Sequence, residues 1–344
     1  MVNEIPSPQD TKLAIIRGIR SVLLDMGSAT KAELSGALQI SFPTVSKFLL
    51  QMEKTGEVSL VGLDESSGGR RAQRYAYNPN YRLGLAIFLE RNETNYIIFN
   101  ASGERIDDGN TGSLIVEEVS SLTKLIETIK LAYPAIHAVS IGVPGAVNNG
   151  KIILIPGYRN YHDLNLKLYL EEHLSIPVVV ENDMNAAVLG YQDHHKMQDK
   201  ASLAYLYLGQ NGPGAGIIVG GEIVRGKSYF SGEVSFIPQY DQQNFQQSLS
   251  RGESGGAASS ATEERIDAIS RTVAAITAIL NPHAIIFGKE EVNSTMLHQI
   301  AERSAIYVPE EHLPELAVSD WKQDYLYGLQ RLGLDLLISC NTHT

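Results

Sequence analysis

Apolar residues near the start of the chain recur at helical spacing. The pattern predicts one helix over residues 11–26, and Thr30 with Glu33 forms an S/T-x-x-E capping box that opens a second, short helix. A third helix is predicted from about Ser41. Its apolar residues follow the i, i+3, i+4, i+7 spacing and are Val45, Phe48, Leu49 and Met52. This order of helices is typical of a helix-turn-helix.

Two strand-like runs follow the third helix. Residues 58–63 and 72–79 are joined by a polar connection with two glycines and two arginines, which predicts a β-hairpin. The order helix, helix, turn, helix, hairpin predicts a winged helix-turn-helix domain over residues 1–79.

Beyond residue 80, strand-like runs alternate with helical patterns, which predicts an α/β body with two similar halves. The predicted strands are 83–89, 95–100, 137–147, 177–182, 202–209, 217–224 and 283–288. The predicted helices are 120–133, 164–174, 183–192, 262–280 and 325–339. Residues 239–261 are rich in Gln, Ser and Gly without periodicity, so we predict a loop or lid there.

Composition narrows the class of protein. With 344 residues, 43% of them hydrophobic and 19% charged, the chain is long enough for two or three globular domains. It has no apolar run of membrane-spanning length and no signal-peptide pattern, so we expect a cytoplasmic protein with no membrane partner. The single cysteine, Cys340, excludes an internal disulfide and a thiolate-rich zinc site.

The net charge of −11 is unevenly distributed. Residues 11–79 carry nine Lys or Arg against six Asp or Glu, so this segment is at +3 and the remainder of the chain at −14. A basic head on an acidic body indicates two functions. Chance fluctuation in a short window is the alternative.

The predicted head carries polar and basic side chains where a winged helix meets DNA. Hydroxyl groups suit bases or phosphates, lysine suits a phosphate, and a glycine-arginine wing tip suits a phosphate track or a narrow minor groove. The candidate DNA-binding residues are Ser41, Thr44, Ser46, Lys47, Arg70 and Arg71. The alternative is a solvated helix face beside a flexible basic loop.

Three segments of the body suggest chemistry. Asp183 follows a buried strand at the start of a helix, where α/β folds place ligands, and could accept a proton from a hydroxyl group. Asn182 could bind the same ligand, although Asp183 could equally just cap the helix. The glycines of residues 212–216 could admit a phosphate, and Glu233 follows a glycine in a turn.

Together these segments resemble the ROK family of repressors, open reading frames and sugar kinases. Residues 141–152 resemble the family's GxPG turn, residues 155–187 its segment ending in END-x-NAA, and residues 231–234 the start of its GE-x-GH element. The resemblance implies an actin-like ATPase (RNase H-like) fold. It divides the body into a first lobe over 80–190 and a second over 191–321, with a C-terminal helix of about 322–344 packing back on the first lobe.

The chain departs from the family's kinases at two loops that hold ATP. Phe88, Glu90, Arg91 and Asn92 stand where the kinases have D-x-G-G-T, and Gly288, Lys289 and Glu290 stand where they have three glycines. A phenylalanine cannot hold a metal–phosphate and a glutamate repels one, so we expect neither ATP binding nor kinase activity.

The zinc motif also departs from the family. Phe236 stands at the family's zinc-binding histidine, and no cysteine follows until Cys340, so no zinc is expected. The aromatic ring could stack on a sugar or fill the space left by the metal, and the filling role is favoured.

The resemblance implies that Asn182, Asp183 and Glu233 bind sugar hydroxyl groups, and Gly145 of the GxPG turn is placed in the same effector-binding set. We therefore predict a homodimeric transcriptional regulator, a repressor, that binds operator DNA and a sugar-like effector in the cleft between the lobes. Two alternatives remain: an active sugar kinase with an accessory DNA-binding head, and a regulator whose sugar site is vestigial.

Overall fold

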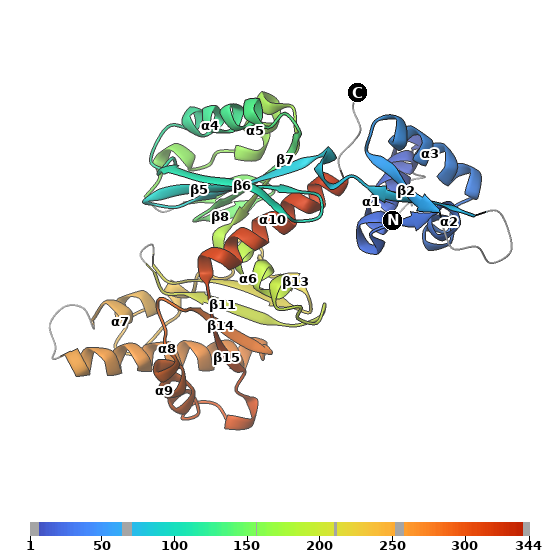
Figure 1. Cartoon of the computed structure of the whole chain (residues 1–344). Coiled ribbons are helices and arrows are strands. Elements are labelled where there is room, and N and C mark those ends of the chain that lie inside the picture. Colours follow the sequence, from blue (N-terminus) through green and yellow to red (C-terminus); the bar gives the residue numbers. More distant parts are fainter. Residues whose placement is uncertain (1–6, 64–70, 156, 210–211, 252–257, 340–344) are drawn as a thin grey trace.

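The computed structural model describes residues 7–63, 71–155, 157–209, 212–251 and 258–339 (Figure 1). Its N-terminal part is a winged helix-turn-helix, as the hydrophobic pattern predicts. The helices are α1 (Pro8–Met26), α2 (Lys31–Leu38) and α3 (Phe42–Lys54). The strands β1 (Ala29–Thr30), β2 (Val58–Leu63) and β3 (Gln73–Tyr77) form an antiparallel sheet in the order β1-β3-β2.

Local signals explain where the helices of this head begin. The Thr30 side chain accepts from the Glu33 backbone N–H and the Glu33 carboxylate accepts from Thr30, so the capping box is present. Ser41 caps α3. The four predicted apolar residues of α3 are buried in the head's core.

The first lobe of the body is a mixed five-stranded sheet in the order β10-β7-β4-β5-β6. Its strands are β4 (Leu83–Leu89), β5 (Glu93–Asn100), β6 (Arg105–Gly112), β7 (Ile136–Val143) and β10 (Val178–Asn182). Helices α4 (Val119–Ala132) and α5 (Leu166–Leu174) cover one face, and a small hairpin of β8 (Ala146–Asn148) and β9 (Lys151–Leu154) follows β7. Short 3₁₀ turns lie at Pro79–Tyr81 (η1) and Arg159–Tyr161 (η2).

The second lobe contains a five-stranded sheet in the order β13-β12-β11-β14-β15. Its strands are β11 (Leu203–Tyr207), β12 (Gly214–Val219), β13 (Glu222–Ile223), β14 (Ala284–Gly288) and β15 (Glu315–Ser319). Helices α7 (Phe245–Arg251), α8 (Ala258–Leu280) and α9 (Ser294–Ser304) pack on one face. The turns η3 (Val234–Phe236) and η4 (Glu310–His312) complete the lobe.

Two helices fill the space between the two body sheets: α6 (Asp183–His194) and the C-terminal α10 (Trp321–Ser339). They pack closely because glycines face the partner helix. A Cβ at Gly190 would collide with the Asp324 carbonyl oxygen, and one at Gly328 with that of Ala186. Helix α10 also packs on β4 and β7, and Figure 1 shows it passing from between the lobes toward the head.

Two predictions about local structure are wrong. The segment 239–261 contains α7 and the beginning of α8, because Phe245 and Leu249 lie one helical turn apart and are buried. The single strand predicted over 217–224 is a hairpin of β12 and β13. The turn lies at Gly220 and Gly221, which have φ angles of 60° and 90° that favour glycine.

A buried ion pair holds the head together and reaches the body. The Arg20 Nε lies 2.6 Å from the Glu57 Oε1, and these side chains are 1% and 0% exposed. The Arg20 Nη1 also donates to the Ile338 carbonyl oxygen near the end of α10, at 3.0 Å. Helix α10 therefore contacts both the body and the DNA-binding head. None of the described helices is both long enough and apolar enough to cross a membrane.

Candidate functional site

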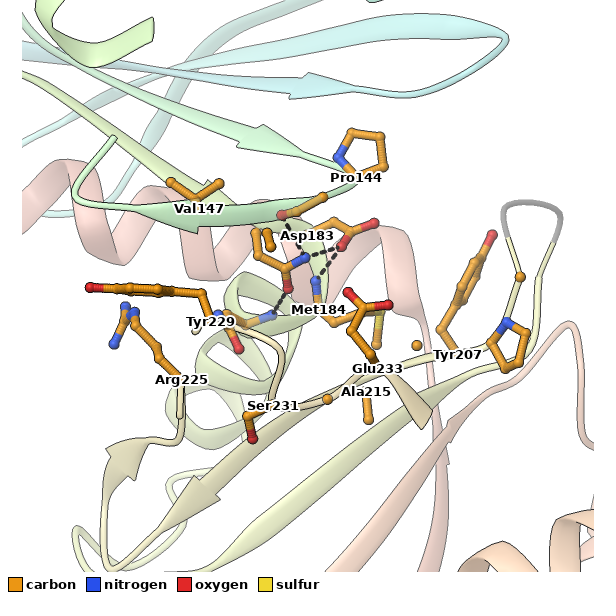
Figure 2. A pocket seen from close by; sticks show the side chains of 18 residues that line it. Pro144, Val147, Asp183, Met184, Tyr207, Ala215, Arg225, Tyr229, Ser231 and Glu233 are labelled. Atoms are coloured by element: carbon orange, nitrogen blue, oxygen red, sulfur yellow. Dashed lines mark hydrogen bonds between the residues drawn. The ribbon is translucent and has the colours of Figure 1, made fainter. Parts of the chain in front are cut away.

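The predicted effector residues gather around one cavity between the lobes (Figure 2). The first lobe contributes Gly145, from the turn between β7 and β8, and Asn182 with Asp183 at the start of α6. The second lobe contributes Glu233, and Figure 2 shows its carboxyl group facing that of Asp183. The cavity has a volume of about 90 Å³, below the range usual for ligand pockets.

Asn182, not Asp183, caps helix α6. The Asn182 Oδ1 accepts from the Asn185 backbone N–H at 2.9 Å, and its Nδ2 donates to the Gly145 carbonyl oxygen at 3.1 Å and to Asp183 at 2.9 Å. A Cβ at Gly145 would collide with the Leu154 carbonyl oxygen, so glycine is required in this turn. One Asp183 oxygen also accepts from the Met184 backbone N–H. The carboxyl group is held in place while it lines the cavity.

The carboxyl groups of the cavity are hard to ionise. Burial, with the nearby carboxylates Glu233 and Glu90, raises the pKa of Asp183 to about 7. Burial also raises the pKa of Glu233. Near neutral pH, Asp183 can therefore exist as a hydrogen-bond donor or as an acceptor.

This raised pKa predicts a pH-dependent stability. The ordinary pKa of an unfolded aspartate is near 3.9, so the folded chain binds more protons between about pH 4 and 7, and its free energy of unfolding falls as pH rises through that window. Asp183→Asn should remove part of this slope, at most about 1.4 kcal/mol per pH unit, and be the more stable protein at pH 8. Urea unfolding from pH 4 to 8 measures both.

The exposed Asp199 is the matched control for this experiment. Asp199→Asn should leave the slope as in the native chain. A slope unchanged by Asp183→Asn would contradict the raised pKa.

An ion pair bridges the two lobes beside the cavity. Arg225, which follows β13 in the second lobe, pairs through its Nη2 with the Glu181 carboxylate at the end of β10 in the first. The other Glu181 oxygen accepts from the Asn182 backbone N–H and the Asn185 side chain, at 3.0 Å each. The relative position of the two lobes is therefore coupled to the residues that line the cavity.

The polar residues that line this cavity and were not predicted as site residues include Arg225, Tyr229 and Ser231. Their only signal was position, since they stand shortly before the Gly-Glu pair at 232–233. Nothing local in the sequence indicates that Arg225 reaches the opposite lobe.

A second cavity, of about 570 Å³, adjoins the first. It gathers both segments that the resemblance places at the ATP loops, although they are about 200 residues apart. Among the lining residues are Glu90, Arg91, Asn92, Gly288, Lys289 and Glu290. Phe88 lies beneath, 1% exposed, with its ring 4.3 Å from that of Tyr325 in an edge-to-face arrangement.

Neither ATP nor zinc fits the residues present. In the second cavity, the Lys322 Nζ pairs with Glu93 at 2.7 Å and the Lys289 Nζ with Asp320 at 2.7 Å, so both ammonium groups are neutralised by carboxylates. Phe236 stands at the family's zinc-binding position and carries no atom that can bind a metal. It is 57% exposed, and its ring lies beside that of Phe230. The expectation that Phe236 fills space is wrong, because its ring is largely in solvent.

The described part of the predicted DNA surface is accessible. Ser41 and Lys47 are exposed on α3, Thr44 and Ser46 are partly exposed, and Arg71 is exposed at the start of the segment leading into β3. The Ser41 and Thr44 hydroxyl groups lie 2.8 Å apart as part of the helix cap. Arg70 falls outside the described residues.

Sequence reasoning missed Phe42 on this surface. Its side chain is 52% exposed at the first position of α3. The sequence did hold a signal for this residue, since Phe42 is an aromatic residue outside the apolar face of the predicted helix.

The fold and cleft define a two-lobed protein of the actin-like ATPase type with a winged-helix head. Residues 86–247 match the sequence profile of the ROK family, so the chain carries a ROK-family domain. A solved structure described as a ROK family transcriptional regulator, a homologue of the E. coli MLC protein, covers 95% of this chain and 98% of its own with a TM-score of 0.72. At 18% identity, this likeness shows the fold.

Curated relatives include both regulators and kinases. A putative xylose repressor of Caldicellulosiruptor sp. (strain Rt8B.4) is 33% identical over 247 residues, 69% of this chain and 60% of the relative. The match thus spans about 60% of that repressor's length. A beta-glucoside kinase of Listeria monocytogenes is 35% identical over 104 residues, 30% of this chain and 35% of the kinase.

Proposed function

We propose that this protein is a DNA-binding transcriptional regulator, a repressor, that responds to a sugar or sugar derivative and does not phosphorylate it. The observation that carries the proposal is the combination of two parts in one chain. A winged helix presents α3 to solvent, and a body cleft keeps Asn182, Asp183 and Glu233 around one cavity. The name of the xylose repressor relative supports the same function.

The proposal includes a mechanism of coupling. The small cavity and the Arg225–Glu181 bridge describe closed lobes, so a bound sugar requires the lobes to move. Helix α10 packs between the lobes and contacts Arg20 of the head. A change in lobe position would therefore move the head, and in a homodimer it would change the spacing of two heads on operator half-sites.

Binding of genomic fragments tests the proposal. DNA of the source organism is selected with the purified chain, and the affinity for a selected fragment is measured with and without sugars. Sequence-specific binding that a sugar weakens is expected. Sequence-independent binding would refute the proposal.

Lys47→Ala tests the role of α3. Loss of one phosphate contact should weaken DNA binding and reduce the slope of log affinity against log salt by about 1. Lys54→Ala is the matched control, because Lys54 is exposed in the last turn of the same helix, and it should leave the slope unchanged. An unchanged slope in Lys47→Ala would place the DNA elsewhere on the head.

The kinase alternative predicts turnover. Phe88 packs in the core and Glu90 lines the cavity at positions that a kinase uses for phosphate, which favours the regulator. An ATP-dependent phosphorylation assay with pentoses and hexoses should show no product, and measurable turnover would establish the kinase.

A regulator with a vestigial sugar site is the second candidate, favoured by the small volume of the first cavity. A thermal-shift screen distinguishes the two, since a ligand that binds only the folded chain raises the melting temperature. No shift with any sugar would favour the vestigial site.

A further inference from the structure

We propose that the second cavity binds a second glycosyl unit, so that the effector is a disaccharide or larger glycoside and not a monosaccharide. The inference rests on the proposed function, because the first unit would occupy the site of Asn182, Asp183 and Glu233. It assigns a ligand to the cleft that the family's kinases use for ATP and that lacks the chemistry for ATP in this chain.

The two cavities form one continuous site. Pro144, Asp183 and Tyr207 line both of them, so a ligand bound at Asp183 in the first cavity faces the opening of the second. The second cavity, of about 570 Å³, is within the range of ordinary ligand pockets, whereas the first, of about 90 Å³, is below it. Most of the space available to an effector therefore lies beyond Asp183.

Aromatic rings form one wall of the second cavity. Tyr207 stacks on Trp321 with ring centroids 4.5 Å apart, and Tyr325 packs against Trp321 at 5.6 Å. Such rings offer a broad apolar surface with polar groups at their edges. The apolar face of a pyranose ring, with hydroxyl groups around its rim, has the matching chemistry.

Two buried donors at this wall have no acceptor among the described residues. They are the Trp321 Nε1 and the Tyr325 Oη. Tyr325 is fully buried above Gly142, where a Cβ would collide with its hydroxyl group. Burial raises the pKa of Tyr325 well above its ordinary value, so the phenol keeps its proton and remains a donor. Because a buried polar group without a partner is costly, a ligand that displaces this wall slightly on binding would gain from bringing oxygen acceptors to these donors.

The charges of the second cavity select against phosphate. The Lys322 Nζ lies 2.7 Å from Glu93 and 3.4 Å from Glu90, and both Glu291 oxygens accept from the Leu208 backbone N–H, at 2.9 and 3.0 Å. Carboxyl groups here accept from hydroxyl groups and repel anions. A neutral ligand rich in hydroxyl groups fits this set, and a nucleotide triphosphate does not.

Trp321, the only tryptophan in the sequence, reports on the second cavity directly. We would titrate the native chain with xylose, glucose, xylobiose, cellobiose and gentiobiose, following affinity by calorimetry and tryptophan emission in parallel. At least one disaccharide should bind about tenfold or more tightly than its monosaccharide and change the emission. The monosaccharides should bind without changing it, and Mg²⁺–ATP should not bind.

Tyr325→Phe removes the buried, unpartnered hydroxyl group beneath the wall of the second cavity. It should weaken disaccharide binding about 3- to 10-fold, the effect of one lost hydrogen bond, and change monosaccharide binding less than twofold. Tyr327→Phe, on the same helix but outside both cavities, is the control and should bind both as the native chain does.

The outcomes separate this inference from the proposed function. If monosaccharides bind as tightly as disaccharides, or if disaccharides leave the emission unchanged, the second subsite is refuted while the sugar-responsive regulator stands. If no sugar binds, both fail. If Mg²⁺–ATP binds and the disaccharides do not, the second cavity is a nucleotide site and the glycosyl subsite is refuted.

Discussion

Glu233→Ala is expected to abolish the release of DNA by the sugar while DNA affinity in its absence stays within about twofold. Glu233 comes from the second lobe and faces Asp183 of the first, so it is placed to hold a sugar hydroxyl group that bridges the lobes. A hydrogen bond to a charged group contributes about 1.5–3 kcal/mol, so sugar affinity should fall about 10- to 150-fold. Gel shifts with a selected fragment, with and without sugar, measure the response.

Glu222→Ala is the matched control. Glu222 is exposed on β13 of the same lobe and lines neither cavity. Glu222→Ala changes the net charge by the same amount as Glu233→Ala does. The control should respond to sugar as the native chain does. A normal response from Glu233→Ala would show that the effector binds elsewhere.

The second large effect is expected from Arg20→Met. The substitution leaves the buried Glu57 carboxylate without its 2.6 Å partner and removes the contact to the Ile338 carbonyl oxygen. Removing one member of a buried ion pair costs about 3–5 kcal/mol, which is comparable with the stability of a small domain. We expect the head to unfold in part and DNA affinity to be lost. Hydrogen exchange of residues 8–26 and 58–63 should rise sharply, with a smaller rise at the end of α10.

Two further variants make this prediction specific. Arg17→Met, an exposed position on the same helix, should change neither exchange nor DNA binding. Arg20→Met combined with Glu57→Leu should recover much of the head's stability, since it removes the unpaired buried charge. Native exchange rates in Arg20→Met alone would show that the ion pair contributes little.

The head could be predicted almost completely from the sequence because its signals are local. The capping box at Thr30 and the apolar positions of α3 lie within one or two helical turns of each other, and both occur in the structure as expected. The body's buried strands were predicted for a similar reason, since continuous apolar runs need little context. The strands that were not predicted include β6 (Arg105–Gly112) and β15 (Glu315–Ser319). Both lie at sheet edges and have no fully buried residue, so no apolar run indicates them.

The candidate site was predictable only where its residues are neighbours in the sequence. Asn182 and Asp183 are adjacent at a strand–helix junction, and their resemblance to a family motif identified them without knowledge of the fold. The sequence also left the role of Asp183 open between helix cap and ligand contact. The structure assigns the cap to Asn182.

By itself, the sequence determined the winged-helix head, the α/β class of the body, and the departures of this chain from the family's phosphate and zinc motifs. Only the tertiary structure showed that Arg225 reaches Glu181 across the cleft, that Arg20 contacts the end of α10, and that the aromatic residues of α10 form a wall beside Asp183. These partners are tens to hundreds of residues apart. Their contacts depend on how the sheets and helices pack against each other. Hydrophobic periodicity indicates which face of a helix or strand is buried, but it does not indicate which distant residue lies against that face.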